Sequence, residues 1–495
     1  MKIASHLLLL TSHLLLLISC TAPKLPQNYQ EVKMLPRIYP DYAEVTIPIN
    51  MAPLSFELLT GADEAITRFA TGSHELLCEG LKARPDMDEW HSLTAAAQGG
   101  TISVEVYARN GNQWMRFKPF SIYVSADSID AWLSYRMISP SYVSYEELTI
   151  NQRCLENYDE RVIADNMLCS TEEGGQCINC HSFQQHNPNR MQLHARQNHG
   201  GTFFLNNGQM EKVNLRSNAM PSAAVYPAWH PQQQLIAYST NSTMQSFHTV
   251  HPNKIEVIDT ESGLILYDVE HHKVSPIEDR RDELETFPCW SPDGQWLYYA
   301  SAHFSYKADT VSTEEIILRA EEVKYNLYRK HFDPQTRHFG ERQLVFAADS
   351  LGLSATLPRL SPCGRWLLFT MGQWGCFHIW HHDADLWLMD LHDGSVRALD
   401  EANSADTESY HSWSSNGRWV VFSSRRTDGV FTRPFFVHID AEGHASKPFE
   451  LPSADPDYHR QLLKSYNIPE LMRGPVDVTP QQVARTLKGE GTALQ

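Results

Sequence analysis

The sequence predicts a mainly β protein. Two observations support this prediction. Four segments of the C-terminal half share one hairpin pattern, and the region from Glu44 to Ser125 reads as a series of short strands. Hydrophobic residues make up 42% and charged residues 20% of the 495 positions, which is a globular composition. A chain of this length exceeds one ordinary core, so we expect several domains.

The four repeated segments each predict a β-hairpin. Apolar residues lead into a turn and β-forming residues leave it, and Pro-Asp-Gly in the second copy gives the preset and positive φ angles that a tight turn needs. A second hairpin follows, for example at Ile255–Asp259, so each repeat predicts four strands. Such a unit cannot bury both faces alone and must stack in a ring. The four segments are Tyr226–Ser239, Phe287–Ala300, Leu357–Thr370 and Tyr410–Ser423.

This pattern, kept in full at Trp290-Ser291-Pro292-Asp293-Gly294, resembles the PD40 (WD40-like) repeat of TolB-like β-propellers. The resemblance covers about residues 200–451. It implies the fold and says nothing about chemistry. An additional hairpin at Thr202–Leu215 looks like half a blade, so we expect five blades, with six as the alternative. The repeats are widely spaced, which predicts insertions, one of them a short helix at Glu314–Val323.

The domain organisation follows from these patterns. We expect a β-sandwich-like domain in front of the propeller and a helical tail behind it, in which Thr479 caps a helix that begins with Pro480. The predicted boundaries are 1–19 for a signal peptide, 20–36 for a tether, 37–126 for the β-sandwich-like domain, 127–199 for a connecting segment, 200–455 for the propeller and 456–495 for the tail.

The first twenty residues predict export. An apolar stretch from Leu7 to Ile18 is too short and too interrupted to span a membrane, which is typical of a signal peptide. It ends at Leu17-Ile18-Ser19-Cys20. Small residues before a cysteine resemble the lipobox of bacterial lipoproteins, which implies lipidation of Cys20; the alternative is an ordinary secretory signal. Thr21-Ala22 lacks the aspartate that retains some lipoproteins at the inner membrane, so we expect a cell-envelope lipoprotein at the outer membrane, facing the periplasm.

The candidate cofactor site is Cys177-Ile178-Asn179-Cys180-His181, which has the spacing of c-type haem attachment. Two thiols three positions apart on one local turn reach the two porphyrin vinyl groups, and the adjacent His181 serves as the proximal iron ligand. A redox Cys-x-x-Cys and half of a zinc site are the alternatives. We therefore expect one covalent haem c.

Three residues are candidates for the distal iron ligand. His194 is our choice, with Met191 and His199 as alternatives in the same short segment. Arg196 is expected to pair with a haem propionate.

The function classes follow from charge and site. A formal net charge of −18 argues against nucleic-acid binding, which needs a basic surface. The whole pattern resembles exported TolB-like lipoproteins with one haem motif, labelled cytochrome c biosynthesis proteins. We expect electron transfer or redox sensing with a periplasmic redox partner protein, and membrane attachment through the lipid. The alternatives are a peroxidase-like haem enzyme with an open axial site and a scaffold propeller with a structural haem; an enzyme is the less favoured class.

Overall fold

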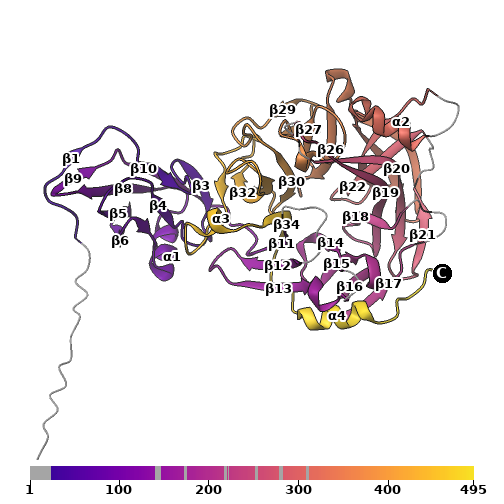
Figure 1. Cartoon of the computed structure of the whole chain (residues 1–495), viewed down its shortest axis with the longest axis horizontal. Helices are drawn as coiled ribbons and strands as arrows, with labels where there is room; N and C mark the ends of the chain where they lie inside the picture. The colour runs from indigo at the N-terminus through magenta and orange to yellow at the C-terminus, as the bar shows by residue number, and fades with distance from the viewer. Residues whose placement is uncertain are drawn as a thin grey trace, which may run out of the picture.

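The computed structural model describes residues 24–139, 147–171, 175–216, 220, 222–250, 253, 255–277, 282–307 and 312–495. The signal segment and Cys20 lie outside these residues. Two parts are apparent in Figure 1: an N-terminal part, indigo, and a larger ring of sheets that holds the rest of the chain. The described part of the chain contains no helix that is both long and apolar enough to cross a membrane.

The N-terminal part is built on one seven-stranded sheet. A three-stranded sheet and helix α1 (Met87–Ala96), capped by Asp86, complete it. Trp90 of α1 packs against Phe69 of the large sheet at a centroid distance of 5.7 Å. A two-sheet sandwich, as expected from the sequence, is not confirmed. The large sheet contains β1 (Gln30–Glu31), β3 (Val45–Pro48), β5 (Glu64–Thr71), β6 (His74–Glu79), β8 (Thr101–Asn110), β9 (Gln113–Arg116) and β10 (Phe120–Ser125); the small one contains β2 (Ile38–Tyr39), β4 (Phe56–Leu58) and β7 (Lys82–Ala83).

The described residues of the ring form six four-stranded antiparallel sheets. From the innermost strand outwards, the first three are β34 (Ser465–Met472), β11 (Trp132–Ile138), β12 (Leu148–Cys154) and β13 (Glu160–Asp165); β14 (Ile178–Phe183), β15 (Arg190–Ala195), β16 (Gly201–Asn206) and β17 (Gln209–Val213); and β18 (Ala224–Trp229), β19 (Leu235–Phe247), β20 (Ile255–Asp268) and β21 (Lys273–Pro276).

The other three sheets follow in chain order. They are β22 (Glu283–Trp290), β23 (Trp296–His303), β24 (Asn326–Asp333) and β25 (His338–Phe346); β26 (Ser354–Leu360), β27 (Trp366–Gly372), β28 (Asp385–Asp390) and β29 (Val396–Ala398); and β30 (Glu408–Trp413), β31 (Trp419–Ser424), β32 (Arg433–His438) and β33 (Phe449–Glu450).

The innermost strands close a circle. β14 contacts β18, β18 contacts β22, β22 contacts β26, β26 contacts β30, β30 contacts β34, and β34 contacts β14. The fold is therefore propeller-like. The closing strand β34 comes from the C-terminal tail and pairs with β11, so one sheet joins distant parts of the chain.

Three sequence expectations differ from this arrangement. Residues 127–199 were expected to connect two domains, but β11 to β15 lie in two sheets of the ring. The hairpin at Thr202–Leu215 is no half-blade, because β16 and β17 complete the sheet that β14 and β15 begin. The tail holds a strand as well as helices. Periodicity within the four repeats could not reveal these strands, so the expected five blades are not confirmed and six sheets are found.

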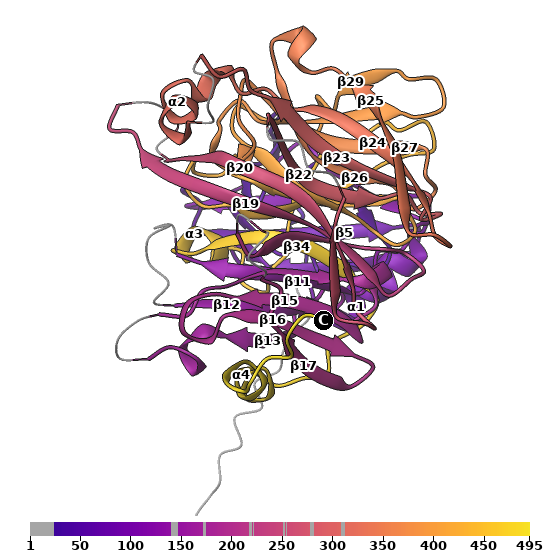
Figure 2. The ribbon, with the colours of Figure 1, turned by 90° about the vertical axis from the view of Figure 1, so that its right-hand side faces the viewer.

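The expected helices are present. α2 (Thr313–Leu318) lies within the predicted insertion, and Thr479 caps α4 (Pro480–Lys488) in a capping box with Gln482. α4 packs on β13, β16 and β17 at the outside of the ring (Figure 2), and α3 (Tyr458–Gln461) precedes β34. α4 thus covers the ring where the tail returns, and α2 packs on β20.

Candidate functional site

All six innermost strands share one irregularity, and it determines which side chains line the site. Each strand has a register shift at the same place and a non-glycine residue with φ between 47° and 54°. An antiparallel bulge of this kind bends the strand and redirects the side chains on both sides of it. The six residues are Cys180, Tyr226, Phe287, Leu357, Tyr410 and Ile468. The second cysteine of the predicted haem motif is therefore one of six equivalent residues around the axis of the ring.

Two cavities lie at the centre of the ring. The first, called here the Arg359 cavity, has a volume of about 240 Å³ and is lined by the residue two positions after each bulge residue. The second, called the Arg196 cavity, has a volume of about 310 Å³ and is lined by Cys177, Asn179, Asn467 and two arginines. Tyr226 and Tyr410 line both cavities, so the two meet at the ring of bulge residues.

The Cys-x-x-Cys-His motif lies on β14 and just before it. Ile178–Phe183 is a strand with a bulge, not the local turn on which we expected the two thiols. Cys177, Cys180 and His181 are buried, with exposed fractions of 4%, 2% and 1%. Both thiols are free. Cys177 lines the Arg196 cavity, whereas Cys180 and His181 line the Arg359 cavity. The strand geometry therefore divides the motif between the two cavities.

The His181 imidazole has no hydrogen-bond partner on either ring nitrogen. Its ring lies against the backbone of Ser134 and Ile468 in a geometry too poor for a full hydrogen bond, and these weak contacts favour the charged form. Desolvation and the charge of Arg136 outweigh them and lower the His181 pKa to about 3. The ring is therefore neutral, the form in which histidine binds a metal. A buried polar ring without partners costs stability, so this residue needs an explanation outside the chain's own hydrogen bonds.

Arg196 shares its cavity with Cys177. The Arg196 backbone N–H donates to the Cys177 carbonyl at 2.8 Å, and Arg136 lines the same cavity. Two buried side-chain oxygens there, on Asn179 and Asn467, lack hydrogen-bond partners. Those two oxygens are acceptors and would not contact an anion, but the two guanidinium groups, with a buried Arg136 Nε that lacks a partner, suit an anionic group. Sequence reasoning found Arg196 and missed Arg136, which lies in the segment expected to be a linker.

The three candidate distal ligands are not in either cavity. His194 lies in β15 with its ring 5.5 Å from that of Tyr238; its Nδ1 is 2.7 Å from the Thr202 hydroxyl, and its Nε2 has no partner. Burial lowers the His194 pKa to about 3. Met191 is fully buried in an apolar cluster, and half-buried His199 ends a short 3-10 turn. The structure does not bring His194 and His181 together in one cavity.

The structure also bears on the zinc alternative and on the state of the cysteines. Within the described ranges, no group of three His, Cys, Asp or Glu side chains is arranged to hold a metal ion, so no zinc site accompanies the motif there. The eight cysteines described are free thiols. A covalent haem needs thiols for its vinyl groups and one imidazole for iron, and the donor types at Cys177, Cys180 and His181 meet that need.

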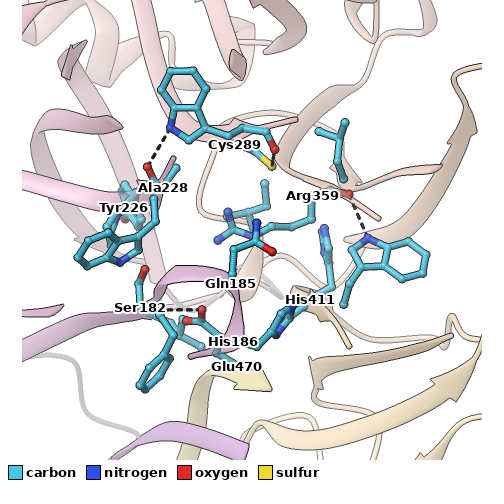
Figure 3. Close-up of a pocket in the computed structure, with 18 of the residues that line it drawn as sticks. Ser182, Gln185, His186, Tyr226, Ala228, Cys289, Arg359, His411 and Glu470 are labelled. Atoms are coloured by element: carbon cyan, nitrogen blue, oxygen red, sulfur yellow. Dashed lines mark hydrogen bonds between the residues drawn. The ribbon is translucent and has the colours of Figure 1, made fainter. Parts of the chain in front are cut away.

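Two charged residues that sequence reasoning missed lie in the Arg359 cavity, shown in Figure 3. Arg359 and Glu470 stand on β26 and β34, and His411 stands between them on β30. Burial raises the Glu470 pKa to about 7, although its carboxylate accepts the Phe183 backbone N–H at 3.1 Å. Comparing Leu357-Pro358-Arg359 with Ile468-Pro469-Glu470 could have found both residues, because each triplet occupies the bulge of its strand.

The comparisons with known proteins add little beyond the fold. No protein-family profile and no curated protein matches the chain. Among solved structures, a puromycin-hydrolysing peptidase of Mycobacterium tuberculosis is similar with a TM-score of 0.37 and 11% identity over 64% of this chain and 45% of that one. A periplasmic gluconolactonase of Pseudomonas aeruginosa is similar with a TM-score of 0.29 and 10% identity over 68% of this chain and 99% of that one. The chain thus spans less than half of the peptidase.

Proposed function

We propose that this chain is an exported, lipid-anchored protein with one c-type haem, which acts in electron transfer or redox sensing in the periplasm. The fold that we infer with it is a six-bladed TolB-like β-propeller, whose surface serves as the platform for a periplasmic redox partner protein. Cys20 carries the lipid that holds the protein at the outer membrane. The single observation that supports the haem most is the buried His181 ring, which lacks a well-formed hydrogen bond on both nitrogens and shares its cavity with the free Cys180 thiol.

The residues have distinct roles in this proposal. Cys177 and Cys180 would hold the porphyrin through thioethers, and His181, kept neutral by burial, would supply the proximal nitrogen. Arg196 and Arg136 would pair with the propionates, because both guanidinium groups line the cavity that Cys177 reaches. The bound haem would supply one-electron chemistry. The chain itself contributes burial, neutral imidazole and positive charge, which are the means by which proteins adjust a haem.

A purely structural role for His181 competes with this proposal. His181 and His411 both follow a bulge residue directly, where the other four strands have proline. His411 fills its place as a packing residue, since its Nε2–H donates to the Leu368 carbonyl at 3.1 Å. His181 lacks the equivalent bond. That difference is our reason to assign a ligand to His181 and none to His411.

The test is a spectrum of the full chain produced together with c-type maturation machinery. We expect a reduced pyridine haemochrome band of covalent haem, retained through denaturation. The double variant Cys177→Ser/Cys180→Ser should abolish it, and Cys154→Ser/Cys376→Ser, which changes two buried cysteines of the ring that line neither cavity, should retain it. Absence of covalent haem in the unmodified chain, or equal loss in both double variants, would overturn the proposal.

The same preparation separates the alternatives. A low-spin spectrum that cyanide leaves unchanged supports electron transfer, whereas a high-spin ferric spectrum supports the peroxidase-like enzyme with an open axial site. His194→Ala, Met191→Leu and His199→Ala then test the distal ligand one by one. If none of the three changes a low-spin spectrum, the distal ligand comes from outside this segment.

A further inference from the structure

The Arg359 cavity is chemically asymmetric, although its wall repeats six times. One residue from each innermost strand lines it, two positions after the bulge. Four of the six are small: Ser182, Ala228, Cys289 and Ser412. The other two are Arg359 and Glu470. Large side chains at all six places would fill the centre of the ring, so the four small residues leave the space that the cavity occupies.

Arg359 forms no ion pair in the part of the chain that the structure describes, although its positive charge opposes the rise in the pKa of Glu470. Among the described residues, no Asp or Glu oxygen lies within ion-pair distance of its guanidinium, although Glu470 is on the same wall. Instead the guanidinium neighbours the buried Cys289 thiol: burial raises the pKa of that thiol, and the charge of Arg359 acts against the increase. Figure 3 shows Arg359, Gln185 and His411 around the cavity, with Glu470 at its far side. A guanidinium facing a cavity without a counterion is prepared for an anion.

The remaining wall selects what kind of anion. Trp229, Trp290 and Trp413 line the cavity together with Pro231 and Pro292, so most of the ligand would meet apolar surface. Only one guanidinium is available, and Glu470 would repel a second negative charge. Burial holds the Glu470 carboxyl near half protonation at neutral pH, and in its protonated form it donates a hydrogen bond. These features favour one carboxylate on a small apolar body over phosphate.

We propose that the Arg359 cavity binds a small organic monocarboxylate, with the carboxylate paired to Arg359 and the apolar part over Ala228 and the tryptophans. Cys180 and His181 line the same cavity, so a haem held by those two residues would compete with the carboxylate, and the proposed site is that of the chain without haem. It rests on Arg359, Glu470 and the small residues, which belong to strands other than the one that carries Cys180 and His181, apart from Ser182. A volume of about 240 Å³ lies just under the range of drug-sized pockets, which restricts the ligand to about the size of benzoate.

Isothermal titration of the full chain, produced without haem, with benzoate tests this site. We expect saturable binding at one site, and no binding of benzamide or inorganic phosphate at the same concentrations. Arg359→Gln should weaken benzoate binding at least about tenfold. Arg418→Gln, which removes an arginine from a hairpin turn outside the cavity, should leave it unchanged. Equal binding of benzoate and benzamide, or full affinity in Arg359→Gln, would overturn the proposal.

Two further variants keep the outcome interpretable. If Arg359→Gln fails to fold, Ala228→Leu fills the cavity and leaves Arg359 in place; it should also abolish benzoate binding, and full binding by this variant would contradict the site. Repeating the titration on Cys177→Ser/Cys180→Ser separates the two proposals. Benzoate binding retained there supports the cavity whatever the haem spectra show, and binding lost only there would mean that the two cysteines, not Arg359, hold the ligand.

Discussion

His181 and His411 occupy the same position in two sheets of one ring, yet only His411 makes the hydrogen bond that this position offers. Both rings are buried and neutral, because desolvation lowers each pKa to about 3. The Nε2–H of His411 donates to the Leu368 carbonyl on the neighbouring sheet, whereas His181 lies against the backbone of Ser134 and Ile468 in a geometry too poor for a full hydrogen bond. The two histidines thus occupy the same position in the fold but differ in whether their ring nitrogens are hydrogen-bonded.

This difference predicts opposite stability effects in protein made without haem. His411→Leu should lower the free energy of unfolding by about 1 kcal/mol or more, because it removes a hydrogen bond and leaves the Leu368 carbonyl unpaired. His181→Leu should cost less than His411→Leu, since it removes two nitrogens that had no partners. Urea unfolding followed by tryptophan fluorescence measures both. Equal losses would show that His181 is an ordinary packing residue and would remove the main support for a ligand there.

The sequence predicted the ring where its repeats are explicit. Pro-Asp-Gly at Pro292 and the hairpin residues around it are local signals, and turn chemistry is decided locally. The strand β34 carries no such signal. Its place is decided by pairing with β11, more than 300 residues earlier, and long-range pairing leaves no trace in a local pattern. For the same reason the segment with the haem motif was expected to connect domains.

The site was predictable in its residues and not in its geometry. Cys177, Cys180 and His181 follow from spacing alone, and Arg196 follows from its nearness in the chain. Arg359 and Glu470 could not be joined without the closed ring, which brings two strands separated by over 100 residues onto one wall. The bulge at Cys180 also escaped prediction, because positive φ at a cysteine has no sequence signature comparable to that of glycine.

Lipidation of Cys20 predicts that one side chain decides where the protein is found. In a bacterial host that processes lipoproteins, the unmodified chain should sediment with membranes and incorporate labelled palmitate. Cys20→Ser should remove the label and move the protein to the soluble periplasmic fraction. Cys363→Ser changes a cysteine that is exposed on the ring and serves as the matched control, so it should behave as the unmodified chain does. A membrane-bound Cys20→Ser protein would mean that the anchor lies elsewhere.

Because the Asp259 carboxyl is buried, we expect the free energy of unfolding to fall as the pH rises through 6. Burial raises its pKa from the ordinary 3.8 to about 6, against hydrogen bonds from Asn241 at 2.8 Å and the Tyr325 hydroxyl at 3.1 Å. Between these values the native state holds a proton that the unfolded state has lost. The contribution is therefore complete below about pH 4 and lost above about pH 6, by roughly 3 kcal/mol.

Urea unfolding at pH 4.5 and 7.5 measures this dependence for the unmodified chain and for Asp259→Asn. The asparagine cannot titrate, so its stability should change less between the two pH values. Glu401→Gln, which alters an exposed carboxylate, should reproduce the dependence of the unmodified chain. If Asp259→Asn shows that full dependence too, the titrating group lies elsewhere in the chain.

We expect the Arg433 side chain to hold the tail strand β34 in the ring. Its side chain is 1% exposed and donates to three backbone carbonyls before β34: Lys464 at 2.6 Å, His459 at 2.7 Å and Leu462 at 2.8 Å. Arg433→Lys keeps the charge and loses the planar set of donors, so several of these carbonyls lose their partner. We expect a loss of about 2–3 kcal/mol in the free energy of unfolding. Arg397→Lys, on the outermost strand β29, should cost less than about 0.5 kcal/mol.

Hydrogen exchange tests whether this effect is local to the closure of the ring. In Arg433→Lys the amides of β34 and β11 should exchange faster than those of β22 and β23. Uniform acceleration across all six sheets would contradict a local role in closure.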